Sequence, residues 1–127
     1  MPLVHVHLAR GRTATARAAI LDGVHAALVE AFRLPADDRN QILHQHEPED
    51  FQARRGNGAV FVEITAFPGR SPAAKKALFA AVVRNLAAAG VEPAAVLTVI
   101  HEPPLESWGI RGGLPASEVD LGFTTRV

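Results

Sequence analysis

Apolar and polar residues alternate in two short segments of the chain, a pattern that predicts two β-strands. The first segment runs from Leu3 to Leu8, where His5 and His7 interrupt the apolar residues. The second runs from Val60 to Ala66, and its apolar positions are in phase with those of the first. Two further strands are expected near Asn40 to His46 and near Ala95 to His101.

A glycine-containing turn and then a helical pattern follow each of the two alternating segments. Thr13 and Ser71 stand at the start of these patterns and are expected to cap the helices. Pro35 and Pro93 mark the exits from the helices. The apolar stripe of the first helix is expected at Ile20, Leu21, Val24, Ala27, Leu28, Ala31 and Phe32, and that of the second at Leu78, Phe79, Val82, Leu86 and Ala87.

The two halves also keep a common register, which indicates an internal duplication. Gly11-Arg12-Thr13 aligns with Gly69-Arg70-Ser71, and at the same separation Pro35 aligns with Pro93. We therefore expect a single domain over 1–127, made of repeats at 1–47 and 59–103 and a tail at 104–127. Three glycines in the tail, Gly109, Gly112 and Gly113, suggest a turn or short hairpin that reaches a neighbouring subunit.

A strand, a helix and a second strand form a right-handed crossover unit with parallel strands. Two such units predict an α/β fold with a four-stranded sheet and two helices on one face. The other face of the sheet would stay open, and its positions are largely apolar. We therefore expect the sheet to pack against copies of itself in an oligomer.

Composition excludes several classes of function. Among the 127 residues, 13 Lys and Arg balance 13 Asp and Glu, which argues against nucleic acid or an anionic membrane as a partner. The absence of cysteine excludes disulfides, thiolate metal sites and a cysteine nucleophile. No apolar run is long enough to span a membrane, and the first residues do not resemble a signal peptide. The expected compartment is the cytoplasm.

Positions at which the two repeats differ are candidates for a functional site. Pro2 aligns with Val60, whereas Asp38 and Arg39 align with Val96 and Leu97. This difference predicts one site per chain. Removal of Met1 would expose the secondary amine of Pro2, and a neutral amine near pH 7 can act as a general base.

Three stretches together resemble the tautomerase superfamily: MPLVHVHLARGRT at the start, PGRSPAAKK after the segment Val60 to Ala66, and SWGIRGG from Ser107 to Gly113. The chain looks like a fused pair of units similar to 4-oxalocrotonate tautomerase, and over its whole length it is closer to malonate semialdehyde decarboxylase. The resemblance implies a β-α-β fold, a homotrimer and chemistry that uses no metal or organic cofactor.

The resemblance also implies roles for individual residues. Pro2 matches the catalytic N-terminal proline. Asp38 matches an aspartate that assists the proline or activates water. Arg70 matches an arginine that binds the substrate carboxylate, and Trp108 matches an aromatic wall of the pocket.

In one respect the sequence departs from the decarboxylase pattern. The positions of a second arginine are held by Phe67 and Pro68, so Arg12 or Arg39 would have to replace it. This departure favours a keto–enol tautomerase acting on small 2-oxo or enol acids. The alternatives are a malonate semialdehyde decarboxylase or hydratase, an activity like that of cis-3-chloroacrylate dehalogenase, and a non-catalytic binding module on the same scaffold.

Two His-x-His pairs leave another hypothesis open. His5 with His7, and His44 with His46, would each point to one face of a strand, as some metal sites require. The simpler interpretation is that they are polar residues at an oligomer interface. No carboxylate is placed by the sequence as a further ligand, so no metal is expected.

Overall fold

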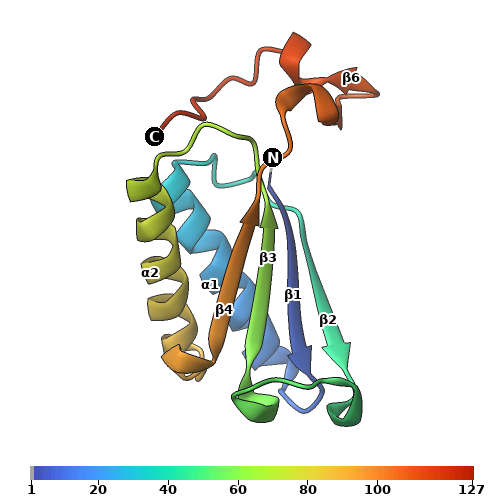
Figure 1. Ribbon diagram of the computed structural model, residues 1–127, viewed down its shortest axis with the longest axis vertical. Helices are drawn as coiled ribbons and strands as arrows, with labels where there is room; N and C mark the ends of the chain where they lie inside the picture. The colour runs from blue at the N-terminus through green and yellow to red at the C-terminus, as the bar shows by residue number, and fades with distance from the viewer. Residues whose placement is uncertain (1) are drawn as a thin grey trace.

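The computed structural model describes residues 2–127 and contains two consecutive β-α-β units followed by a small hairpin (Figure 1). The first unit comprises β1 (Leu3–Ala9), α1 (Ala14–Phe32) and β2 (Gln41–His46). The second comprises β3 (Val60–Thr65), α2 (Pro72–Ala88) and β4 (Val96–His101). The hairpin consists of β5 (Gly109–Ile110) and β6 (Leu114–Pro115). The expected hairpin in the tail is therefore present.

The four long strands form one sheet in the order β2-β1-β3-β4. Pairing is parallel within each unit and antiparallel between β1 and β3. In that central pair Leu3 lies opposite Thr65 and Leu8 lies opposite Val60. The start of β1 therefore meets the end of β3, and the two units are related by an approximate twofold rotation. The predicted fold class is confirmed.

Side-chain caps start both helices, as predicted. The Thr13 hydroxyl accepts a hydrogen bond from the Ala16 amide, and the Ser71 hydroxyl accepts one from the Ala74 amide, each at 3.1 Å. These bonds satisfy amides that have no partner within the helix. Helix α1 ends at Phe32, and the next residue, Arg33, has a left-handed φ of 54°, as is common where helices end.

Both helices cover the same face of the sheet and form the core with it (Figure 1). Helix α2 buries Leu78, Ala81, Val82 and Leu86. The expected stripe was wrong at Phe79 and Ala87, which are exposed. Residues 78, 82 and 86 follow one line along a helix of 3.6 residues per turn, whereas residue 79 is rotated about 100° from residue 78.

The two helices pack closely at Gly23, where α1 meets α2. The Asn85 side-chain amide donates to the Gly23 carbonyl at 2.9 Å. A Cβ atom on Gly23 would lie 3.2 Å from the Asn85 Cβ, so a side chain there would require α2 to give by a few tenths of an ångström. Within the described part of the chain, no helix is long and apolar enough to cross a membrane.

Candidate active site

The antiparallel pairing of β1 with β3 brings the start of the chain beside the connection that follows β3. Pro2 is buried at this end of the sheet. Its carbonyl accepts a hydrogen bond from the Asn40 side chain at 3.2 Å, which ties the start of β1 to the loop before β2. That loop also contains Asp38, whose amide donates to the Pro35 carbonyl at 3.0 Å. Met1, whose removal the sequence suggested, lies outside the described residues.

Arg70, in the connection between β3 and α2, is the one charged residue that is buried in the described part of the chain, with 6% of its surface exposed. One guanidinium nitrogen donates to the Phe67 carbonyl at 2.9 Å, and the guanidinium carbon lies 4.8 Å from the centre of the Phe32 ring. Its Nε has no hydrogen-bond partner among the described residues. Burial lowers the pKa of Arg70, while the nearby carboxylates of Glu102 and Asp38 act in the opposite direction. The position is suited to an anionic ligand.

A pocket of about 280 Å³ is lined by Asp38 and by Phe67, whose carbonyl accepts the hydrogen bond from Arg70, but Arg70 itself does not line it. Trp108 packs edge-on against Phe67, with ring centres 4.8 Å apart and planes at 75°. The Trp108 indole N–H donates to the Pro103 carbonyl at 3.1 Å, which holds the ring in place. Of the expected site residues, Pro2, Asp38, Arg70 and Trp108 therefore belong to segments that meet at one end of the sheet.

The other two expected arginines lie elsewhere within the chain. Arg39 forms an exposed ion pair with Asp22 at 2.7 Å and also donates to the Gln41 side chain. Arg12 follows the far end of β1 and donates to the Gly58 carbonyl at 2.9 Å. Neither side chain is brought to Arg70 within one copy of the chain.

Sequence reasoning missed Arg111, which lines the same pocket as Asp38. Arg111 occupies the turn between β5 and β6, and its guanidinium donates to the Asp120 carbonyl at 2.9 Å. The sequence did contain a signal for Arg111. It is an arginine within the Gly-Ile-Arg-Gly-Gly segment, in a tight turn where glycine is the usual residue.

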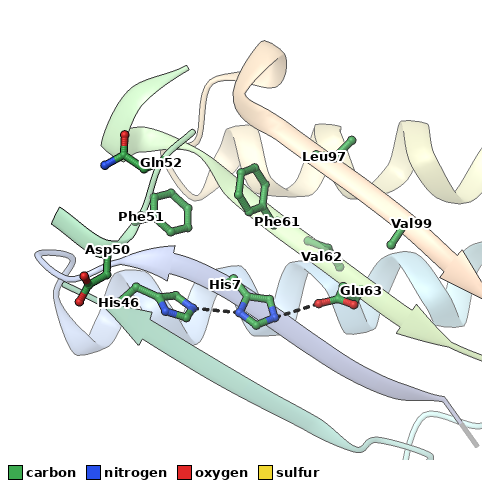
Figure 2. Close-up of a pocket in the computed structure, with 10 residues that line it drawn as sticks. All are labelled: His7, His46, Asp50, Phe51, Gln52, Phe61, Val62, Glu63, Leu97 and Val99. Atoms are coloured by element: carbon green, nitrogen blue, oxygen red, sulfur yellow. Dashed lines mark hydrogen bonds and ion pairs between the residues drawn. The ribbon is translucent and has the colours of Figure 1, made fainter. Parts of the chain in front are cut away.

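The face of the sheet opposite the helices is open and partly apolar. Leu97 and Val99 on β4 are 63% and 44% exposed. Together with Phe61 they line a hollow of about 450 Å³ on this face, which His7 and Glu63 also border (Figure 2). A face with this character is suited to contact with another protein surface.

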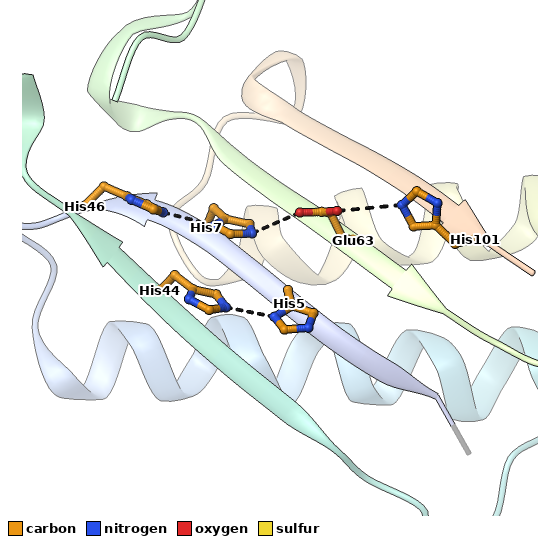
Figure 3. A network of polar contacts seen from close by, with 6 residues as sticks. All are labelled: His5, His7, His44, His46, Glu63 and His101. Atoms are coloured by element: carbon orange, nitrogen blue, oxygen red, sulfur yellow. Dashed lines mark hydrogen bonds and ion pairs between the residues drawn. The ribbon is translucent and has the colours of Figure 1, made fainter. Parts of the chain in front are cut away.

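The histidines of the same face form two polar groups: one runs from His46 through His7 and Glu63 to His101 and crosses all four strands, and the other is the pair of His5 and His44 (Figure 3). His5 and His44 share a hydrogen bond of 2.8 Å, and His7 and His46 share one of 2.9 Å. The His7 ring also contacts the Glu63 carboxylate at 3.0 Å, and His101 lies 3.6 Å from that carboxylate. No group of three or more potential ligands among residues 2–127 is arranged to hold a metal ion.

Comparison with known proteins identifies the family. Two family models, both described as "Tautomerase enzyme", match the chain, one over residues 38–111 and the other over residues 2–55. The chain belongs to the tautomerase family. Among curated proteins it is 25% identical, over 121 residues, to the probable tautomerase YusQ of Bacillus subtilis (strain 168), covering 89% of this chain and 95% of that protein.

Solved structures support the same assignment. The FG41 malonate semialdehyde decarboxylase inhibited by 3-bromopropiolate is 34% identical, with a TM-score of 0.79, over 89% of this chain and 92% of that chain. A wild-type fused 4-OT, solved as a symmetric trimer, is 26% identical, with a TM-score of 0.82, over 91% of this chain and 96% of that chain. The similarity therefore extends over nearly the whole of both chains.

Proposed function

We propose that this chain is a cofactor-independent keto–enol tautomerase for small 2-oxo or enol acids, in which Pro2 transfers the proton. The observation that carries the proposal is the burial of Arg70, whose Nε–H has no partner among the described residues, at the end of the sheet where Pro2 precedes β1. Arg70 would bind the substrate carboxylate through charge-assisted hydrogen bonds. A pocket of about 280 Å³ suits a small ligand.

Removal of Met1 would turn the Pro2 nitrogen into a secondary amine. Burial and a nearby cation both favour the neutral form of an amine, which can accept a proton near pH 7. In ketonisation, the amine takes the proton of the enol hydroxyl and the carbonyl forms at C2. The same proton is then delivered to C3. Arg70 stabilises the negative charge that develops on the oxygen between these two steps.

Asp38 and Trp108 would complete the site. Asp38 lies close enough to Arg70 to affect its pKa, and it would position the proline or a water molecule. Trp108, held by its hydrogen bond to Pro103, would keep water from the apolar part of the substrate. No step of this reaction requires a metal or an organic cofactor.

We also propose that the chain assembles as a homotrimer through the open face of the sheet. The hollow lined by Phe61, Leu97 and Val99 would then be covered by a second copy (Figure 2). The trimer named for a fused 4-OT structure with a TM-score of 0.82 supports this arrangement.

Decarboxylation of a 3-oxo acid is the second candidate. It is favoured by the 34% identity to malonate semialdehyde decarboxylase over 89% of this chain, although Phe67 and Pro68 replace a second arginine. In that reaction the bond from C2 to the carboxylate breaks, CO₂ leaves, and the resulting enolate takes a proton at C2. Pro2 would supply that proton in its protonated, ammonium form, acting as a general acid and becoming neutral.

Substitution of Pro2 tests the proposal. Pro2→Ala still allows Met1 removal and leaves a primary amine, and we expect ketonisation of phenylenolpyruvate and 2-hydroxymuconate to fall about 100-fold or more. Mass spectrometry of the intact protein would verify that Met1 is absent, and unchanged melting temperature and oligomer size would serve as controls. Unchanged activity in Pro2→Ala would refute the role of Pro2.

A parallel assay separates the candidate functions. Release of CO₂ from malonate semialdehyde, compared with ketonisation by the same preparation, distinguishes a decarboxylase from a tautomerase. Specific binding of an acid without turnover in either assay would favour the non-catalytic module.

A further inference from the structure

Five of the six histidines lie on the open face of the sheet, the face through which we propose that the chains assemble. The titratable side chains of this face come from all four strands: His5 and His7 on β1, His44 and His46 on β2, Glu63 on β3, and His101 on β4. Asp50, in the loop after β2, borders the hollow next to His46. The sixth histidine, His25, belongs to α1 on the other side of the sheet and bonds to the Ala36 carbonyl at 2.7 Å.

The two polar groups on this face differ in their access to a counter-charge. In the longer group, the Glu63 carboxylate lies 3.0 Å from the His7 ring and 3.6 Å from the His101 ring. A proton on either ring would therefore be balanced by Glu63. Within residues 2–127, no ion pair joins His5 or His44 to a carboxylate. A proton on this pair would stay unbalanced.

The contacts of the His5–His44 pair oppose protonation. The His5 Nδ1 and the His44 Nε2 share one hydrogen bond of 2.8 Å, so one of these two nitrogens has to act as the acceptor. If both rings were protonated, two N–H groups would face each other at that distance. The His44 ring also stacks on His7, with ring centres 4.5 Å apart and planes at 11°. Burial and the rings of His7, His5 and His46 lower the pKa of His44, and Glu63 opposes them least.

The surroundings of the pair are apolar. Ile42 lies opposite His5 in the parallel pairing of β1 with β2 and is 46% exposed, and Leu3, two residues before His5, is 39% exposed. A second copy that covered these side chains would also take the pair out of water. Removing an unbalanced charge from water is costly, whereas a neutral, hydrogen-bonded pair can be buried. Protonation of the pair and assembly of the chains therefore oppose each other.

Resting on the assembly proposed above, we propose that the His5–His44 pair makes association with further copies of this chain depend on pH. The neutral pair lies within the contact between copies, and protonation of the pair releases the chains from one another. The change falls at mildly acidic pH, because free histidine side chains take up a proton near pH 6.5. The open face is thus an interaction surface for a second copy that acid switches off.

Sedimentation velocity over a concentration series tests the dependence. We expect the wild type to be trimeric at pH 7.5, and its dissociation constant to rise about 100-fold or more by pH 5.5, since each proton taken up contributes up to about tenfold per pH unit. Far-UV circular dichroism at each pH would restrict the comparison to folded protein. A dissociation constant that is the same at both pH values would overturn the inference.

Matched variants locate the effect. In the double variant His5→Gln/His44→Gln, the amides can still share a hydrogen bond but cannot be protonated, so the dissociation constant should change less than about tenfold over the same range. His101→Gln on the same face and His25→Gln on α1 should follow the wild type. An unchanged pH dependence in the double variant, or its loss in His101→Gln, would contradict the role of the pair.

Proton uptake provides a measurement on the unaltered protein. Dilution of the trimer near pH 6.5 in a calorimeter, in buffers with different ionisation enthalpies, should show net proton uptake as the chains separate. Absence of uptake would overturn the inference even if the double variant failed to fold. A wild type that is monomeric at pH 7.5 would overturn the proposed assembly as well. None of these results depends on ketonisation, so unchanged activity in Pro2→Ala would refute the catalytic proposal alone.

Discussion

The two ends of the central sheet have the same framework and opposite chemistry. At one end, β1 begins at Leu3 next to buried Pro2, and Arg70 follows the neighbouring strand. At the other end, β3 begins with fully buried Val60, and Arg12 follows the neighbouring strand. Arg70 is buried, whereas Arg12 donates to a carbonyl at the surface. The two β-α-β units have like frameworks, and only the first has a proline directly before its first strand.

The pockets at the two ends extend this contrast. They are similar in size, about 280 Å³ at the Pro2 end and about 270 Å³ at the other. Asp37 and Asp38 line the first pocket, and their repeat counterparts Ala95 and Val96 line the second. The two ends therefore have pockets of similar volume, but acidic residues line only the pocket at the Pro2 end, and the described residues of the other lining include Arg54 and Arg55 instead.

The largest difference between the ends should appear in the two equivalent arginines. We expect Arg70→Ala to lower kcat/KM for ketonisation about 100-fold or more, since it removes a donor to the developing charge. Arg12→Ala, the matched variant at the other end, should stay within about twofold, because the Arg12 guanidinium donates to a carbonyl at the surface. An equal loss in Arg12→Ala would mean that this arginine reaches the site of a neighbouring copy, and the contrast between the ends would fail.

A smaller effect concerns the open face, where histidines are concentrated in the first unit. Burial lowers the pKa of His44 from its usual 6.5, and the nearby rings of His7, His5 and His46 lower it further, while Glu63 opposes them. The folded protein therefore resists protonation of His44, so the free energy of unfolding should fall as the pH drops below 6.5 and level off below the folded-state pKa.

Urea denaturation at a series of pH values and one fixed protein concentration would measure this dependence. His44→Gln cannot be protonated, and its stability should therefore decline less steeply below pH 6.5 than that of the wild type. If the unfolding free energy of both proteins declined equally steeply below pH 6.5, His44 would not be a source of acid sensitivity.

The smallest expected effect tests what the two units have in common. Thr13→Ala and Ser71→Ala each remove a hydroxyl that caps a helix at 3.1 Å, and each should cost about 1 kcal/mol of unfolding free energy. Both variants should retain ketonisation activity, since the caps belong to the framework. Strongly unequal costs in thermal unfolding would show that the units are not energetically equivalent.

Much of the fold could be predicted because its signals are local. Alternation located β1 and β3, helical periodicity and hydroxyl residues located α1 and α2, and the constant register of the repeats indicated two like units. Phe79 was misplaced because a helix with many alanines has a weakly defined apolar face, so a neighbouring position can be mistaken for a buried one. The candidate site was harder, because its members lie far apart in sequence.

By itself, the sequence determined the elements, their caps and the distinctive Pro2, since each depends on residues close together in the chain. Tertiary structure decided which arginine accompanies that proline. The antiparallel pairing of β1 with β3 places Arg70 at the Pro2 end and sends Arg12 to the opposite end. It also brought Arg111 to the pocket, because a hairpin's position depends on what it packs against rather than on its own residues.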